Sequence, residues 1–179
     1  TFKVENSAAA NSLKAKADLT RDEQAKIIGQ VTTNWDFNVA KNLTSSNLTK
    51  ASKANKGDVL VLAPNDGTAR SIADTFKSDK DVSSYVISGQ DAEKASVQYI
   101  IDGKQSMTVF KDVRTLVKDA IATATSILKN ETPDASGVTN NGKADIKTKQ
   151  TDIIVVDQST VKKDLVDSGY YSASDFTGL

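Results

Sequence analysis

Short apolar runs alternate with longer amphipathic segments along most of this chain. The run Asp58-Val59-Leu60-Val61-Leu62-Ala63-Pro64 has the length and composition of a buried strand. Residues 112–129 instead place apolar side chains at the helical i, i+3, i+4 and i+7 spacing. This alternation predicts βαβ units, hence an α/β fold of three layers in which a parallel sheet carries helices on both faces. Strands are expected at 2–4, 26–31, 58–64, 83–88, 107–110 and 152–157, and helices at 7–18, 38–53, 67–78, 91–102, 112–129 and 160–167.

Two further segments depart from this alternation. Residues 131–151 are polar and contain turn formers, so we predict a loop, with a hairpin turn at Asn141-Gly142. Residues 169–176 include three aromatic side chains and are expected to form a packed terminal turn.

Composition narrows the classes of function. The 179 residues suffice for one domain, and 23 Lys and Arg balance 23 Asp and Glu. A formal charge of zero gives no electrostatic reason to expect nucleic acid or an anionic membrane as a partner. Cys and His are both absent, which excludes disulfides, thiolate catalysis and a Ser-His-Asp triad. Catalysis is therefore disfavoured, and neither a metal ion nor a cofactor is expected.

Polar side chains follow three of the predicted strands. Asn65 and Asp66 come directly after strand 58–64, Asp91 follows the next strand, and Lys111 follows strand 107–110. In open α/β sheets, ligands bind outside the carboxyl ends of the strands. An amide, carboxylates and an amine at one edge favour a site for a polyol.

The residues at these strand ends occur in a familiar order. Along the chain they are Trp35, Pro64-Asn65-Asp66-Gly67-Thr68-Ala69, Ser88-Gly89-Gln90-Asp91-Ala92, Met107-Thr108-Val109-Phe110-Lys111, Asn140-Asn141-Gly142 and Val166-Asp167-Ser168-Gly169-Tyr170-Tyr171. Their order and spacing resemble the C-terminal half of the xylose-type sugar-binding proteins of bacterial ABC transporters, which are class I periplasmic binding proteins.

The resemblance implies a two-lobed receptor that holds a sugar between its lobes. Residues 1–179 then form a single sugar-binding lobe, and 111–129 resemble the segment that returns to the N-terminal lobe. The resemblance covers the second lobe only, so we expect the N-terminal lobe or a second chain to cover the apolar face of helix 112–129. The family's Asp-Asn-Asn-Ala turn near the hinge reads Glu5-Asn6-Ser7-Ala8 here, a departure at its first and third positions. At the matching Asn6, the resemblance implies a hinge contact.

Each matching residue suits a sugar chemically. A carboxylate such as Asp91 accepts two hydroxyl groups at once, while Asn65 offers one acceptor and two donors. Lys111 only donates, and the flat face of Trp35 can cover an apolar sugar face. Asp66 is a fifth candidate, which could instead cap the helix that begins at 67.

Each candidate also has a purely structural alternative. Trp35 could be a core or rim aromatic, Asn65 and Asp66 an Asx turn or helix cap, Asp91 the cap of a helix over 92–102, and Lys111 a solvated lysine. For any one residue taken alone, the structural alternative is favoured. All of these residues together, in the order found in the family, favour the sugar-binding site.

These observations lead to one interpretation and two alternatives. We expect non-catalytic, extracytoplasmic binding of a monosaccharide, xylose or a related aldose, for uptake by an ABC permease, with a lipoprotein anchor possible upstream. The first alternative is a ligand-sensing module, either a partner of a sensor kinase or the effector domain of a LacI-type repressor. The second is a sugar enzyme that uses Asp91 and Lys111 as an acid–base pair.

Overall fold

The computed structural model describes residues 20–179. The strand expected at 2–4, the helix expected at 7–18 and the candidate residue Asn6 lie outside the described residues. The chain divides into two compact units. The first contains the residues up to Phe110 together with Val155–Leu179, and the second contains Lys111–Ile154. Each unit is described below by itself.

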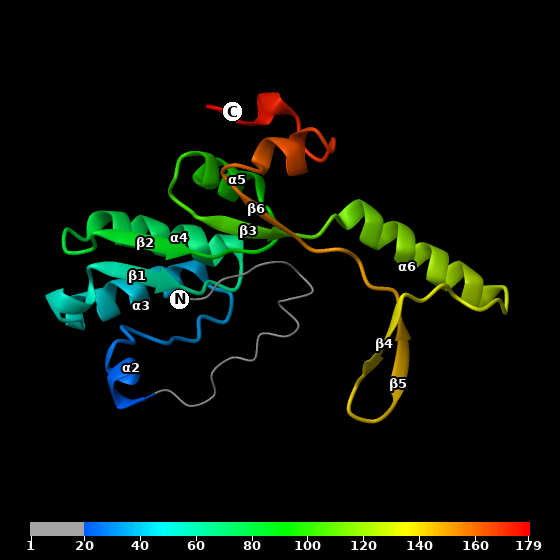
Figure 1. Ribbon diagram of the computed structural model, residues 1–179, viewed down its shortest axis with the longest axis horizontal. Helices are drawn as coiled ribbons and strands as arrows, with labels where there is room; N and C mark the ends of the chain where they lie inside the picture. The colour runs from blue at the N-terminus through cyan, green and yellow to red at the C-terminus, as the bar shows by residue number, and fades with distance from the viewer. Residues whose placement is uncertain (1–19) are drawn as a thin grey trace. The chain divides into compact units, whose positions relative to one another are not determined.

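Parallel strands form the centre of the first unit (Figure 1). Strand β1 (Asp58–Val61) pairs in parallel with β2 (Ser84–Ile87), with Leu60 opposite Val86. Both strands lie where the apolar runs predicted them. They are shorter than predicted: beyond β1, the backbone N–H of Ala63 donates to the Ser88 side chain at 2.9 Å instead of to a strand backbone.

The sheet continues toward the C-terminal part of the chain. Strand β3 (Met107–Phe110) pairs with β6 (Ile154–Asp157). A parallel bridge between Gln90 and Val109 links the end of β2 to β3. The spatial order is therefore β1, β2, β3, β6, and the predicted parallel sheet is confirmed for these links between β1, β2 and β3.

Three helices pack with one face of β1 and β2. They are α3 (Phe37–Lys50), α4 (Asp66–Ser78) and α5 (Lys94–Ile101). Alternate residues of the strands contribute to their common core, as period-two alternation requires. This first core consists of Leu48, Ala63, Ala69, Ile72, Ala73, Phe76 and Ile87, with Val59, Val61, Val82, Tyr85 and Tyr99 packed at its border.

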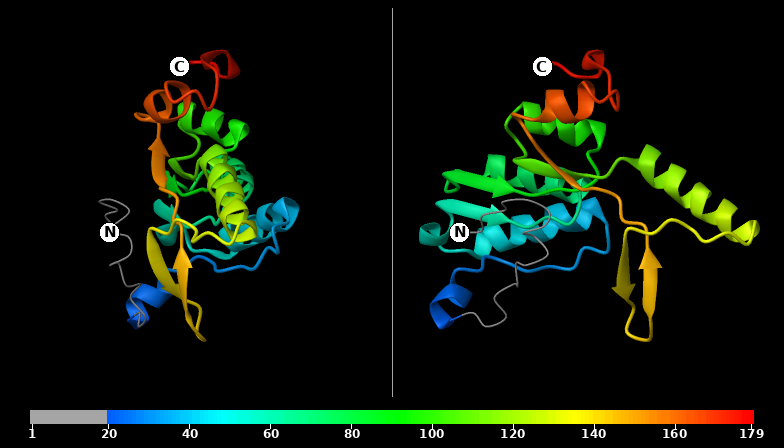
Figure 2. Two further views of the ribbon diagram at one scale, coloured as in Figure 1. Left: turned by 90° about the vertical axis from the view of Figure 1, so that its right-hand side faces the viewer. Right: turned by 45° about the vertical axis from the view of Figure 1, so that its right-hand side comes forward.

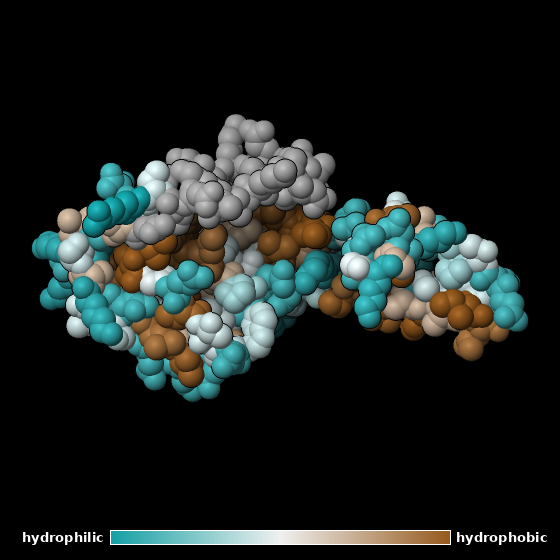
Figure 3. Space-filling model, turned by 90° about the horizontal axis from the view of Figure 1, so that it is seen from below, coloured by the Kyte–Doolittle hydropathy of each residue, from teal (hydrophilic) through white to brown (hydrophobic). Residues whose placement is uncertain are grey.

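The alternate residues of these strands point to the opposite face. Leu60 and Val86 are 53% and 54% exposed, and Leu62 is 77% exposed. Figure 3 shows apolar residues at the surface of both units. An apolar sheet face of this kind is expected where a fold carries a second helical layer.

A second core joins α5 to the C-terminal segment. It comprises Ala92, Val97, Ile100, Phe110, Val156, Val161, Leu165 and Phe176. Edge-to-face aromatic contacts extend it, with ring centroids 4.6 Å apart for Phe110 and Tyr170 and 5.4 Å apart for Tyr171 and Phe176. The predicted packed terminal turn is thus confirmed. Residues Lys162–Val166 form a π-helical turn (η2) where a helix was predicted, and Ala173–Asp175 form a 3-10 turn (η3).

The segment before α3 differs from the prediction. A short helix, α2 (Arg21–Ala25), precedes it, and 26–31 form no strand in the described structure. Gly29 instead lies against α3, since a Cβ atom added to it would come 2.1 Å from the side chain of Asn47. The predicted strand is wrong because its backbone packs on a helix rather than beside another strand.

The end of α3 is also reorganised. The predicted helix over 38–53 ends at Lys50 and is followed by a 3-10 turn, η1 (Lys53–Asn55). Lys56, which comes next, is buried and forms an ion pair of 2.9 Å with Asp79. This ion pair connects the residues just before β1 with the C-terminal end of α4.

The second unit consists of one helix and one hairpin. Helix α6 (Val113–Leu128) matches its predicted range, and the antiparallel strands β4 (Gly137–Asn140) and β5 (Asp145–Thr148) confirm the predicted hairpin. Figure 2 shows these two strands side by side. Gly142 adopts a φ of 88° in the turn, as a hairpin glycine should. None of the residues of α6 is buried within the described structure, and its apolar side chain Ile121 is 63% exposed.

Each helix within residues 20–179 is too short or too polar to cross a bilayer.

Candidate functional site

The parallel strands bring polar residues to one edge of the first unit, at their carboxyl ends. The backbone N–H of Asp66, after β1, donates to the carbonyl of Gln90, after β2, at 3.0 Å. The N–H of Asp91 donates to the carbonyl of Val109 in β3 at 2.9 Å. These bonds tie the ends of three neighbouring strands together. Asn65 and Asp91 therefore lie at the same edge of the sheet, as the sequence predicted.

Asn65 begins helix α4 from an extended backbone with φ −153° and ψ 172°. Its Oδ1 accepts a hydrogen bond from the N–H of Thr68 at 3.1 Å, which is the N-cap arrangement. The structural alternative of a helix cap is thus confirmed for Asn65. Capping uses the side-chain oxygen only, so the Nδ2 group keeps two donor hydrogens suited to hydroxyl oxygens.

Asp91 is exposed and has a backbone conformation that few residues other than glycine adopt. Its φ is 98°, and that of Ala92 is 50°. Helix α5 begins only at Lys94, with Glu93 in the N-cap position. The prediction of a helix from residue 91, and the alternative that Asp91 caps it, are therefore wrong. The positive φ values at residues 91 and 92 exclude the helical backbone there, and the N–H groups of Ala92 and Glu93 donate to side chains of other elements.

Trp35 occupies the turn before α3, with a φ of 63° and 65% of its surface exposed. This exposure excludes the alternative of a core aromatic. Phe37, the first residue of α3, packs on Gly67 near the start of α4, because a Cβ atom at Gly67 would lie 2.3 Å from the phenyl ring. The start of α3 is therefore next to the start of α4. Trp35 lies two residues before α3, so its meeting with Asn65 stays a prediction.

Lys111 and Asn6 complete the predicted set. Lys111 directly follows β3 and is half-buried. It is the first residue of the second unit, so its meeting with Asn65 and Asp91 stays a prediction. Asn6 lies outside the described residues and also stays a prediction.

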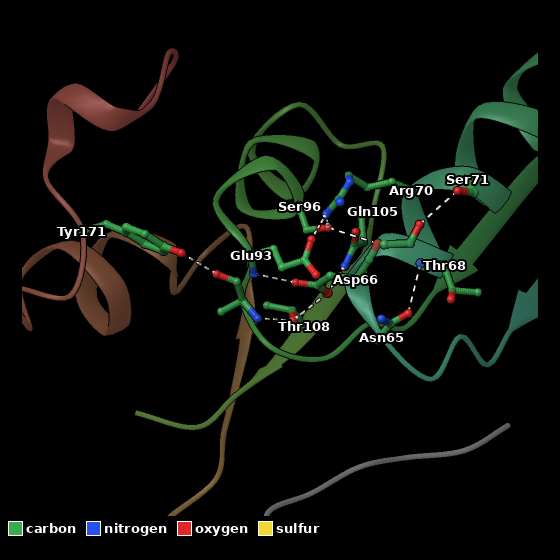
Figure 4. Close-up of polar contacts among 12 residues, drawn as sticks. Asn65, Asp66, Thr68, Arg70, Ser71, Glu93, Ser96, Gln105, Thr108 and Tyr171 are labelled. Carbon is green, nitrogen blue, oxygen red and sulfur yellow. Dashed lines mark hydrogen bonds and ion pairs between the residues drawn. The ribbon is translucent and has the colours of Figure 1, made fainter. Parts of the chain in front are cut away.

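Asp66 points into the protein and is completely buried (Figure 4). Its Oδ1 accepts hydrogen bonds from Gln105 Nε2 at 2.9 Å and from Thr108 Oγ1 at 2.8 Å. Its Oδ2 accepts from the backbone N–H of Glu93 at 2.8 Å. Since Asn65 is the cap of α4, the capping role suggested for Asp66 is wrong. The carboxylate accepts three hydrogen bonds inside the first unit and has no exposed surface to offer a ligand.

The electrostatic setting of Asp66 follows from this burial. Burial raises the pKa of Asp66 above its ordinary value, and the hydrogen bonds from Gln105, Thr108 and the Glu93 backbone oppose that rise. The nearby carboxylate of Glu93 adds to the rise, although Arg70 forms an ion pair with Glu93 at 2.7 Å. All three hydrogen-bond partners donate, so the geometry suits the ionised form of Asp66.

Sequence reasoning did not identify the residues that support this edge. Thr108 stands out in retrospect because it is a fully buried hydroxyl residue within an apolar strand. Gly89 is a weaker indication, since a glycine just after a strand can mark a close approach of the backbone to another group. Nothing in the sequence indicates the role of Gln105. Among residues 20–179, carboxylates do not gather in threes as metal ligands would.

A family model covers most of the chain. The periplasmic binding protein domain matches residues 5–132. The chain is also 30% identical over 162 residues to the D-xylose-binding periplasmic protein of Haemophilus influenzae, and the match covers 89% of this chain and 48% of that protein. The chain spans about half the length of the curated relatives it matches.

Solved structures give the same result. A carbohydrate transporter solute binding protein from Chloroflexus aurantiacus, in complex with D-glucose, is 64% identical with a TM-score of 0.81, over 98% of this chain and 52% of that one. An ABC transporter solute binding protein from Clostridium phytofermentans with bound β-D-glucose is 25% identical with a TM-score of 0.71, over 82% of this chain and 48% of that one. These proteins are named as binding or solute-binding proteins rather than as enzymes, and the curated relatives as periplasmic. The predicted resemblance and fold class are thereby confirmed, and the chain belongs to the periplasmic binding protein domain family.

Proposed function

We propose that this chain supplies one lobe of an extracytoplasmic receptor that binds an aldose for uptake by an ABC permease. The lobe binds the sugar without chemical conversion. The observation that carries the proposal is the convergence of Asn65 and Asp91 at one sheet edge, fixed by the backbone bonds between the strand ends. The sugars named for the relatives, D-xylose and D-glucose, support the class of ligand.

The groups at this edge complement the surface of a pyranose. Asp91 accepts from hydroxyl groups, the Nδ2 group of Asn65 donates to hydroxyl oxygens, and Lys111 adds a cationic donor. The exposed ring of Trp35 offers a flat apolar surface for the C–H face of the sugar. Charge-assisted hydrogen bonds supply orientation, and the aromatic face supplies apolar contact.

The proposed site is one half of a complete site. The chain spans about half the length of its relatives, and the apolar face of α6 is exposed. We propose that a first lobe, or a second chain, covers this face and closes over the sugar. Water excluded by closure strengthens polar contacts, so a two-lobed site reaches micromolar affinity, about 8 kcal/mol. The isolated lobe should bind far more weakly.

Calorimetry on two proteins tests this proposal. One is the 179-residue chain alone. The other is a chimera in which the chain replaces the matched 52% of the Chloroflexus aurantiacus protein. We expect heats of binding for D-glucose or D-xylose near the detection limit for the chain alone, and at least micromolar affinity for the chimera. Micromolar binding by the chain alone would refute the half-site.

Matched variants of the chimera then test the residues. Asp91→Asn and Trp35→Ala should each weaken sugar binding at least about tenfold, which corresponds to about 1.4 kcal/mol. Asp58→Asn makes the same chemical change at the opposite end of β1, where Asp58 accepts a hydrogen bond from Ser84 Oγ, and should leave affinity unchanged. Equal effects of Asp91→Asn and Asp58→Asn would contradict the proposed site.

A further inference from the structure

We propose that Asp66 is a positioning residue whose buried carboxylate fixes the backbone around Asp91, and so determines where the Asp91 carboxylate is presented. This inference rests on the proposed function only for the role of Asp91. The positioning itself is a property of the chain without ligand. The observation that carries it is a chain of hydrogen bonds from Asp66 to the two peptide groups that follow Asp91.

Three hydrogen bonds hold the peptide planes on both sides of Asp91. The N–H of Asp91 donates to the carbonyl of Val109 at 2.9 Å and fixes the preceding plane. The N–H of Ala92 donates to Thr108 Oγ1 at 3.1 Å and fixes the following plane. The N–H of Glu93 donates to Asp66 Oδ2 at 2.8 Å and fixes the plane after that. The dihedral angles of residues 91 and 92 are set by these planes.

Two of these three bonds depend on Asp66. The bond from Glu93 reaches it directly. The bond from Ala92 reaches it through Thr108, because the hydroxyl group of Thr108 donates its one hydrogen to Asp66 Oδ1 and so turns a lone pair toward Ala92. Left-handed φ values at both positions are unfavourable for residues with a side chain. The Asp66 network supplies the constraint that holds them.

The network accepts only a group without hydrogens at position 66. Gln105 Nε2 donates one hydrogen to Asp66 Oδ1 and the other to the carbonyl of Met107 at 3.0 Å. Reversal of this amide would give up the bond to Met107. The Gln105 amide and the Glu93 backbone N–H are therefore fixed as donors to the carboxylate, and the Thr108 hydroxyl donates to it while accepting from Ala92. An asparagine at position 66 has the same shape as the aspartate. Its NH₂ group, however, would point its hydrogens at one of the groups that now donate to the carboxylate.

The atoms around the Asp66 carboxylate are closely packed and leave no room for an additional methyl group. A Cβ atom at Gly89 would lie 2.2 Å from Asp66 Oδ1 and 2.3 Å from Gln105 Nε2. From the other side, the hydroxyl group of Tyr171 donates to the carbonyl of Ala92 at 2.9 Å (Figure 4). The segment after β2 is thus held between Asp66 inside and the C-terminal segment outside.

Nuclear magnetic resonance on the complete 179-residue chain without ligand tests the positioning. The readouts are the HN–Hα couplings of residues 91 and 92, which report φ, and the hydrogen exchange of the Ala92 and Glu93 amides. The variants are Asp66→Asn and Thr108→Val, with Thr108→Ser as the conservative rescue. Asp74→Asn makes the same change as Asp66→Asn at an exposed carboxylate of the same helix. Phe76→Leu lowers stability through the first core without touching the network.

We expect Asp66→Asn and Thr108→Val to change both couplings and to speed exchange at residues 92 and 93 at least about tenfold, the effect of about 1.4 kcal/mol. Thr108→Ser and Asp74→Asn should resemble the wild type, and Phe76→Leu should speed exchange throughout the first unit with the couplings retained. If Asp66→Asn does not fold, Thr108→Val alone decides. Unchanged couplings in a folded Asp66→Asn or Thr108→Val would overturn the proposal.

The same spectra separate this inference from the proposed function. D-glucose and D-xylose are titrated into the wild type and into Thr108→Val, and amide shifts near Asn65 and Asp91 report weak binding. Altered couplings together with a dissociation constant raised at least about tenfold support the whole proposal. Altered couplings, with no sugar-dependent shifts even in the wild type, support the positioning, and sugar binding by the chimera then decides the proposed function separately. Unaltered couplings with clear sugar binding leave the proposed function standing and reject the role of Asp66.

Discussion

Gly89→Ala is the substitution for which the structure gives the sharpest prediction. Gly89 is buried and does not have a positive φ, so its backbone would accept an alanine. The cost is steric. The new Cβ atom would stand 2.2 Å from Asp66 Oδ1, 2.3 Å from Gln105 Nε2 and 3.3 Å from the carbonyl of Met107. Neither side-chain atom can move away easily, because each is held by hydrogen bonds within the first unit.

The magnitude follows from two contributions. Overpacking a filled interior costs about 1–3 kcal/mol, and the displaced Asp66 loses hydrogen bonds to a charged group worth about 1.5–3 kcal/mol. We therefore expect Gly89→Ala to lower the free energy of unfolding by about 2.5–6 kcal/mol. Gly57 provides the control, since a Cβ atom there meets nothing within 4 Å. Gly57→Ala should be neutral, or stabilising by up to about 1 kcal/mol through the unfolded chain.

Urea unfolding followed by near-ultraviolet circular dichroism measures this difference. All four tyrosines, at 85, 99, 170 and 171, belong to the first unit, so the signal reports unfolding of that unit alone. A loss below about 1 kcal/mol for Gly89→Ala, or a loss equal to that of Gly57→Ala, would show that the carboxylate site has slack. The positioning role of Asp66 would then lose its geometric basis.

Three further predictions concern the rest of the chain. The hydrogen bond from Lys56 holds the pKa of Asp79 below its ordinary 3.8, so its contribution to stability is present above about pH 3.8 and is lost as pH falls through the lower folded pKa. Asp79→Asn should reduce the slope of the unfolding free energy against pH below about pH 3.8. An unchanged slope would contradict the stabilising role of this ion pair. Tyr171→Phe removes the bond to Ala92 and keeps the ring contacts, so urea unfolding should show a loss of about 0.5–1.5 kcal/mol. Ile121→Ser on exposed α6 should change the stability of the isolated chain by less than about 0.5 kcal/mol, yet weaken sugar binding in the chimera. Equal binding would argue against a covered α6.

The sequence predicted the regular elements well where local pattern and packing agree. Helix α6 and strand β3 lie within a residue of their predicted ranges, and the hairpin turn at Asn141-Gly142 is present. Residues 26–31 show the limit of this reasoning. An apolar alternation predicts a strand only where a partner strand is available, and here Gly29 lies against α3. Which element a backbone meets is decided by tertiary packing, and no local pattern reveals it.

The candidate site was predictable in position and only partly in role. Strand ends of a parallel sheet must share an edge, and this rule brings Asn65 and Asp91 together. The rule cannot assign tasks to neighbours such as Asn65 and Asp66. Both are short polar residues at a strand-to-helix turn, and both can cap a helix. The direction of each side chain depends on the donors around it, and those come from residues 93, 105 and 108, far along the chain.

The outcome nevertheless has a physical logic. A buried carboxylate is stable only when donors surround it, whereas an amide that caps a helix with its oxygen keeps donors for a ligand. The two residues therefore could not exchange positions: an asparagine at 66 would face donors with its own hydrogens, and an aspartate at 65 would bring no donor to the edge. The order Asn65-Asp66 thus places the amide, which both donates and accepts hydrogen bonds, at the edge of the sheet. The carboxylate, which only accepts, lies in the interior. The geometry of Asp91 then depends on a carboxylate that is buried inside the first unit, where exposure to a ligand cannot reveal its role.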